Sequence, residues 1–87
     1  MSHDTKNESM ESLIAAQISE LTKKPSSMLS NDTSLLDSGI LDSLSLLKLV
    51  LFLEKRFAIS VPAEELVPDN FQTIDSMCDY VRSKQGK

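Results

Sequence analysis

The sequence predicts an all-α protein with three main helices and one short helix. Three segments repeat apolar residues at helical intervals of three and four positions, which gives each segment one buried face. Proline, glycine and Asx residues separate these segments. The one trace of β alternation, "AISV" at residues 58–61, is too short to build a sheet. A chain of 87 residues therefore predicts one small helical domain.

The first helix is expected to begin near Ser9 and to stop at Pro25. Either Ser9 or Thr5 offers a side-chain oxygen as the N-cap. The apolar stripe that predicts this helix consists of Met10, Leu13, Ile14, Ile18 and Leu21.

The composition of the two ends predicts short tails around the domain. We expect a disordered polar tail over residues 1–7, a single domain over 8–84 and a C-terminal tail over 85–87. The only histidine, His3, lies in the first tail. The only cysteine, Cys78, has no partner for an internal disulfide, and its place on an apolar stripe predicts a core residue.

Residues 25–41 form a long connection, and connections beyond about 12–15 residues without regular structure are usually functional. Gly39 supplies a residue that tolerates positive φ just before the next helix. Apolar residues along the connection are expected to attach it to the core: Met28, Leu29, Leu35, Leu36, Ile40 and Leu41.

The second helix, expected over residues 43–56, is apolar on two sides. One side is expected to pack against the first and last helices; it carries Leu46, Leu49, Val50, Leu53 and Phe57. The opposite side carries Leu44, Leu47 and Leu51 beside Lys48 and Lys55. Since a small domain has too few helices to cover both sides, the second side predicts a docking surface. The alternative is that the long connection folds back over Leu47 and Leu51.

Prolines punctuate the rest of the chain. Pro62 is expected to open the short helix at "PAEEL", because proline is tolerated in the first turn. Pro68 is expected to end it. Thr73 is the predicted cap of the last helix, whose apolar stripe is Ile74, Met77, Cys78 and Val81.

Asp42 and Ser43 stand directly before the most apolar segment. As N-cap, Asp42 would accept the backbone N–H of Leu44 or Ser45, which leaves Ser43 at the first helical position with its hydroxyl outward. An Asp-Ser pair is common at helix starts, so the pair alone is weak evidence of function. A helix N-terminus does favour an anion such as a phosphodiester.

Charge and composition exclude several classes of function. The net charge of −4 and the pI near 4.8 oppose nucleic-acid binding. A serine hydrolase needs a base, usually histidine, and His3 in the tail does not serve Ser43, so we expect no enzyme. The chain has no cluster of metal ligands. With no signal peptide and no apolar run of ~20 residues, it predicts a cytoplasmic monomer without membrane insertion.

Residues 32–81 resemble the acyl carrier protein family. The resemblance is carried by Asp42-Ser43-Leu44 after a glycine-containing loop, by "LEKRF" and "ISVP" further on, and by the "F-x-T-I" pattern of Phe71 to Ile74. It implies a four-helix bundle of acyl-carrier type with 4′-phosphopantetheine esterified to Ser43. A phosphopantetheinyl transferase would donate this arm from coenzyme A with Mg²⁺, helped by Asp42, and substrates would ride on its thiol as thioesters.

The resemblance also implies that partner enzymes dock on Leu44, Leu47 and Leu51, with Lys48 and Lys55 setting the charge preference. Carriers of fatty-acid synthesis usually present acidic residues on this helix, whereas residues 43–57 here sum to +2.

Two further positions of the second helix, Leu46 and Phe52, are bulkier than is common in fatty-acid carriers. We therefore expect a specialised stand-alone carrier, loaded by an acyl- or aminoacyl-activating ligase and used by downstream transferases or synthases. The alternative is an unmodified helical interaction module in which Ser43 belongs only to a cap.

Overall fold

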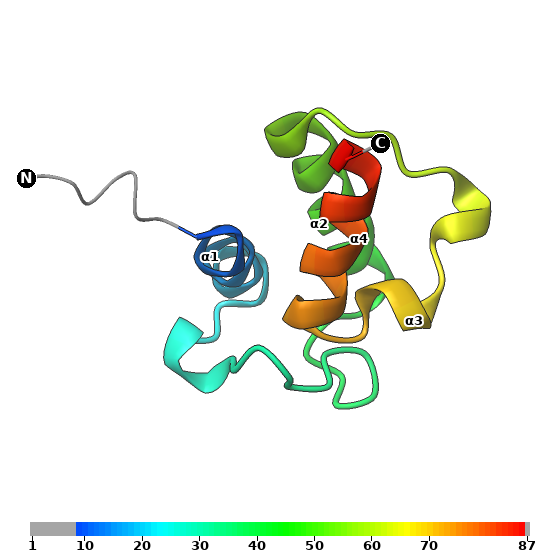
Figure 1. Ribbon diagram of the computed structural model, residues 1–87. Coiled ribbons are helices and arrows are strands. Elements are labelled where there is room, and N and C mark those ends of the chain that lie inside the picture. Colours follow the sequence, from blue (N-terminus) through cyan, green and yellow to red (C-terminus); the bar gives the residue numbers. More distant parts are fainter. Residues whose placement is uncertain (1–8, 87) are drawn as a thin grey trace, which may run out of the picture.

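The computed structural model describes residues 9–86, which form helices, turns and loops without a strand. The elements are α1 (Met10–Thr22), the 3₁₀ turn η2 (Ser26–Met28), α2 (Ser43–Phe57), the 3₁₀ turn η3 (Ala63–Glu65), α3 (Pro68–Phe71) and α4 (Ile74–Gly86). The three long helices all contact one another, and α3 packs on α4 (Figure 1). The predicted all-α fold with four helices is confirmed. The predicted tail at residues 1–7, with His3, lies outside the described residues.

The helix ends follow local side-chain chemistry. The Ser9 hydroxyl accepts the Ser12 N–H at 3.0 Å, so Ser9 caps α1. The Thr73 hydroxyl accepts the Ser76 N–H at 3.0 Å and caps α4 as predicted. The left-handed residue Ala58 (φ 56°) ends α2. At the other end of the domain α4 continues to Gly86, past residue 84, where the sequence predicts the domain to end.

The short helix differs from its prediction. Residues 63–65 form only a 3₁₀ turn, and Pro68, expected to end a helix, instead begins α3. Proline is found after the end of a helix because it cannot continue the helix. It is equally favourable at the start of one, where its fixed φ fits the first turn and its missing N–H would have no intrahelical partner.

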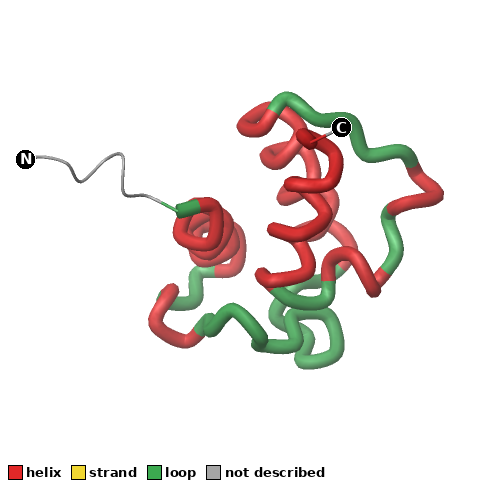
Figure 2. The backbone as a smooth tube through the Cα atoms, in the orientation of Figure 1, coloured by secondary structure: helices red, strands yellow, loops and turns green. Residues whose placement is uncertain are grey.

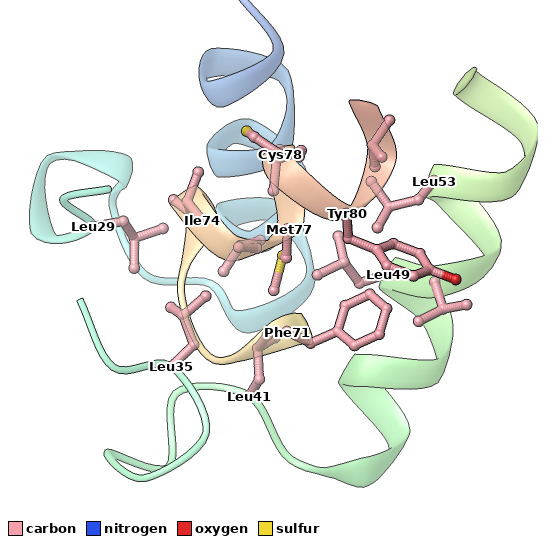
Figure 3. Packing of buried hydrophobic residues seen from close by; sticks show 14 residues of the cluster. Leu29, Leu35, Leu41, Leu49, Leu53, Phe71, Ile74, Met77, Cys78 and Tyr80 are labelled. Carbon is pink, nitrogen blue, oxygen red and sulfur yellow. The ribbon is translucent and has the colours of Figure 1, made fainter. Parts of the chain in front are cut away.

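One continuous core joins the helices and the long loop (Figure 3). Its buried residues are Ile14 and Ile18 of α1, Leu29, Leu35 and Leu41 of the loop, Leu49, Val50 and Leu53 of α2, Phe71 of α3, and Ile74, Met77, Cys78, Tyr80 and Val81 of α4. Leu46 and Phe57 pack against it while partly exposed. The core side of α2 is therefore the one that the sequence predicts.

The prediction for Met28 is wrong, since its side chain is 59% exposed. Met28 is the last residue of the 3₁₀ turn, and Leu29 after it is extended (φ −113°, ψ 97°). The two adjacent side chains point in different directions, and that of Leu29 is the one buried in the core.

A polar contact fastens the segment after α2 to α4. The Tyr80 hydroxyl donates to Glu65 at 2.6 Å, and the Lys84 ammonium donates to the same carboxylate oxygen at 2.9 Å. These two donors lower the pKa of the Glu65 carboxyl. The Tyr80 ring also lies 5.3 Å from the Phe71 ring, centroid to centroid, so one side chain joins α3, α4 and the 3₁₀ turn at residues 63–65.

Leu53→Ala should test the assignment of the core side. Leu53 has no exposed surface, and such truncations cost about 2–5 kcal/mol of unfolding free energy, a large part of a total of about 5–15 kcal/mol. Urea unfolding followed by circular dichroism measures the loss. Leu51→Ala on the same helix is the matched control, because Leu51 is 60% exposed and should change stability by less than about 0.5 kcal/mol. Equal losses in the two variants would contradict the assignment.

Candidate functional site at the start of α2

Asp42 caps α2 with the geometry that the sequence predicts. Its backbone is extended (φ −98°, ψ −176°) and its carboxylate accepts the Ser45 N–H at 2.8 Å. Of the two predicted donors, Ser45 rather than Leu44 makes this bond. Hydrogen bonding from the Ser45 backbone, with a further contribution from the Ser45 side chain, lowers the pKa of the Asp42 carboxyl.

Ser43 is the first residue of α2 and is exposed to solvent. Unpaired N–H groups and the positive end of the helix dipole lie at this position, which favours a negatively charged substituent. An exposed hydroxyl here fits a phosphodiester-linked group, which needs outward access and gains from nearby N–H groups.

The loop that leads to this pair is anchored one residue before Asp42. The Leu41 side chain is 2% exposed and that of Leu35 is fully buried, and the Leu41 N–H donates to the Leu35 carbonyl at 3.0 Å. Between them Gly39 takes the predicted positive φ of 83°. Residues 35–41 thus form a short loop that leaves the core at Leu35 and returns to it at Leu41, just before the site. Figure 2 shows this segment as loop throughout.

Gln72, between α3 and α4, holds the other side of that loop. Its side-chain oxygen accepts the Ser34 hydroxyl at 2.7 Å and the backbone N–H groups of Leu36 and Asp37, each at 3.1 Å. Its backbone carbonyl accepts the Leu35 N–H at 2.7 Å. No pattern in the sequence marks Gln72 as a functional residue, apart from its place as the second residue of the "F-x-T-I" pattern.

The second side of α2 is exposed. Leu44, Leu47 and Leu51 are 62%, 49% and 60% accessible, and Lys48 and Lys55 are exposed among them. The long loop does not fold over these leucines, so the alternative that made them core is wrong. We call these five residues the α2 outer face.

Other features lie away from Ser43. A surface pocket is lined by α1 and by residues 26–31, and none of its lining residues belongs to α2. Cys78 is buried, and desolvation, with a smaller contribution from Glu11, raises the pKa of its thiol to about 11. Within residues 9–86, no group of three or more His, Cys, Asp or Glu side chains could hold a metal ion. No helix in this range is long and apolar enough to cross a membrane.

The sequence profile of the phosphopantetheine attachment site family matches residues 12–81. The chain belongs to this family. It is an acyl-carrier-type protein with covalently attached 4′-phosphopantetheine, as the resemblance implied.

Known relatives of this carrier are D-alanyl carrier proteins. That of Streptococcus uberis is 35% identical over 55 residues, which cover 63% of this chain and 70% of the relative. That of Streptococcus sanguinis is 38% identical over 50 residues, 58% of this chain and 63% of the relative. That of Streptococcus pyogenes serotype M5 is 37% identical over 54 residues, 62% and 68% respectively. The alignments thus span about two thirds of the relatives' own length.

Asp42→Asn should remove the charge of the cap but keep an acceptor oxygen. Because the pKa of Asp42 is lowered in the folded state, its carboxylate stabilises the fold above the ordinary Asp value of 3.8, and this contribution is lost as pH falls through the folded value. The variant should therefore be less stable than the parent at pH 7, and the difference should shrink below about pH 4. Urea unfolding at pH 7, 5 and 3 measures it. A difference that stays constant over this range would contradict a charged cap.

Proposed function

We propose that Ser43 carries the phosphopantetheine arm and that the protein delivers acyl or aminoacyl groups as thioesters on it. The observation that carries this proposal is the exposed Ser43 hydroxyl at the first position of α2, directly after a residue that caps the helix. Of the neighbouring serines, Ser38 donates to the Leu35 carbonyl at 3.4 Å and Ser45 is partly buried in the first helical turn. Ser43 combines exposure with the helix N-terminus.

The cargo we propose is a small aminoacyl group, of the D-alanyl class after which the relatives are named. The packing of the helices supports a small cargo, since Leu49, Leu53 and Met77 have no exposed surface and Leu46 and Phe52 pack against the same core. A long acyl chain could enter this interior only by displacing them. The thiol of the arm holds the cargo, and the chemistry of loading and transfer belongs to other proteins.

The partners we propose are a phosphopantetheinyl transferase, an aminoacyl-activating ligase and a downstream transferase. We place their contact on the α2 outer face, where apolar side chains are exposed next to Ser43. Exposed apolar residues at the centre of an interface carry affinity, and charges at its rim tune association rate and choice of partner. Because Lys48 and Lys55 border the leucines, the matching partner surface is an apolar depression with an acidic rim.

Replacement of the attachment residue tests the proposed function. With coenzyme A, Mg²⁺ and a broad-specificity phosphopantetheinyl transferase, the protein should gain the mass of one arm, and Ser43→Ala should gain none. Ser38→Ala and Ser45→Ala are the matched controls and should still be modified. Intact-mass and peptide-mapping mass spectrometry give the result. A Ser43→Ala protein that still gains the arm would overturn the assignment.

The thiol of the arm can be followed independently of mass. The buried Cys78, with its thiol pKa raised to about 11, should react slowly with a disulfide reagent at pH 8 while the protein is folded. The native modified protein should therefore show one fast-reacting thiol and the native unmodified protein none. Two thiols should appear in the modified protein after unfolding in urea.

Leu47→Asp should test the α2 outer face. Leu47 is 49% exposed, so the substitution should leave the fold intact by circular dichroism. It places a charge at the centre of the proposed interface, and loading by the cognate ligase should fall by about tenfold or more. Normal loading would mean that the docking face lies elsewhere.

Lys48→Glu separates the rim from the centre of this face. Loading should slow more at low salt than at high salt, because ionic screening weakens interactions between exposed charges. The loading rate of each variant, measured over a range of salt concentrations, shows the difference. Lys24→Glu, the same change of net charge at an exposed position after the end of α1, is the control.

A further inference from the structure

A polar side chain outside α2 holds the segment that presents Ser43. The Gln72 side-chain oxygen accepts three donors from residues 34–37, and none of these bonds uses its amide nitrogen. With the bond from Leu35 to the Gln72 backbone carbonyl, four hydrogen bonds join one residue to one short stretch of loop. Gln72 lies 35 to 38 positions after these loop residues in the chain.

These bonds act on the stretch that leads from the core into the exposed part of the loop. Leu35 and Leu41 are fixed by burial at the two ends of the loop 35–41, but Asp37, Ser38 and Gly39 between them are exposed. The Gln72 oxygen is the acceptor for the N–H groups of both Leu36 and Asp37. The next bond along the chain, from Gly39 N–H to the Leu36 carbonyl at 3.2 Å, builds on the position of Leu36.

We propose that Gln72 is a positioning residue for attachment of the arm, a role that rests on the proposed function of Ser43. Its side-chain oxygen holds residues 34–37 in the conformation in which the loop returns to Leu41 and presents Asp42 and Ser43 to the transferase. Without this oxygen, residues 35–41 sample other conformations, and only a fraction of the molecules is competent to bind the transferase. The Michaelis constant for the carrier then rises by the inverse of that fraction, while turnover of the bound carrier stays the same.

Three variants isolate the acceptor oxygen. Gln72→Met has similar size without a polar acceptor, and Gln72→Glu keeps an acceptor at the same reach. Gln17→Met on α1 is the control for the same chemical change away from the loop. The assay is transfer from coenzyme A by a broad-specificity transferase at 25 °C, with rates from intact mass and folding checked by circular dichroism.

Gln72→Met should raise the Michaelis constant for the carrier about tenfold with unchanged kcat. Gln72→Glu and Gln17→Met should stay within about twofold of the parent. A folded Gln72→Met protein with parental kinetics would overturn the proposal. So would a Gln72→Glu protein as slow as Gln72→Met, because rescue by an acceptor is what a general packing role does not predict.

If Gln72→Met fails to fold, amide hydrogen exchange of the unsubstituted protein tests the proposed role of Gln72 instead. The Leu36 and Asp37 amides should exchange slowly for an exposed loop, since both donate to the Gln72 oxygen. Exchange as fast as that of the Ser27 amide would overturn the proposal. These outcomes are separate from failure of the proposed function, in which the parent protein itself would gain no arm at Ser43.

Discussion

Burial of one side of α2 is the interaction on which the rest of the structure depends. Leu49 and Leu53 have no exposed surface, and α1 and α4 both close on that side of the helix. Because α1 and α4 both cover this side of α2, no other long helix of residues 9–86 covers the opposite side. The exposed leucines of the α2 outer face are therefore a consequence of how the core is closed, and not an addition to it. Stability and a surface available for recognition come from the same packing.

The long loop shows how a segment without regular structure is kept in place. Fixing a flexible connection costs conformational entropy, and three buried leucines at positions 29, 35 and 41 offset that cost at intervals. Hydrogen bonds to Gln72, and one from the Asp75 N–H to the Asn31 carbonyl at 3.0 Å, satisfy backbone groups that the loop cannot pair internally. The start of α2 is consequently held to the core through this loop, although residues 25–41 precede it as a long connection.

The parts of the fold that could be predicted from the sequence are those that rest on local spacing. The stripes of the long helices and the caps at Ser9, Asp42 and Thr73 depend on residues three or four positions apart, which a sequence displays directly. The position of Gly39 before α2 is local in the same sense. For the site, the exposed Asp42-Ser43 pair at the start of α2 and the exposed second side of this helix could both be predicted.

What could not be predicted depends on contacts between distant segments. Gln72 meets residues 34–37, and Tyr80 meets Glu65, only because α3 and α4 bring them together. No periodicity in the sequence marks a polar residue that serves a remote backbone. The prediction for Pro68 is wrong for another reason, since proline is favourable both after the end of one helix and at the start of the next.

The charge of α2 has a consequence for how the carrier meets its partners. The helix carries +2 within a chain of −4, so the remainder carries −6. The charge of α2, carried by Lys48, Lys55 and Arg56 against Glu54, is thus opposite in sign to that of the rest of the chain. An acidic surface of the kind proposed above for the partner attracts α2. The rest of the carrier is repelled by the same surface. Encounters with α2 toward the partner are thereby favoured over other orientations, which raises the rate of productive association.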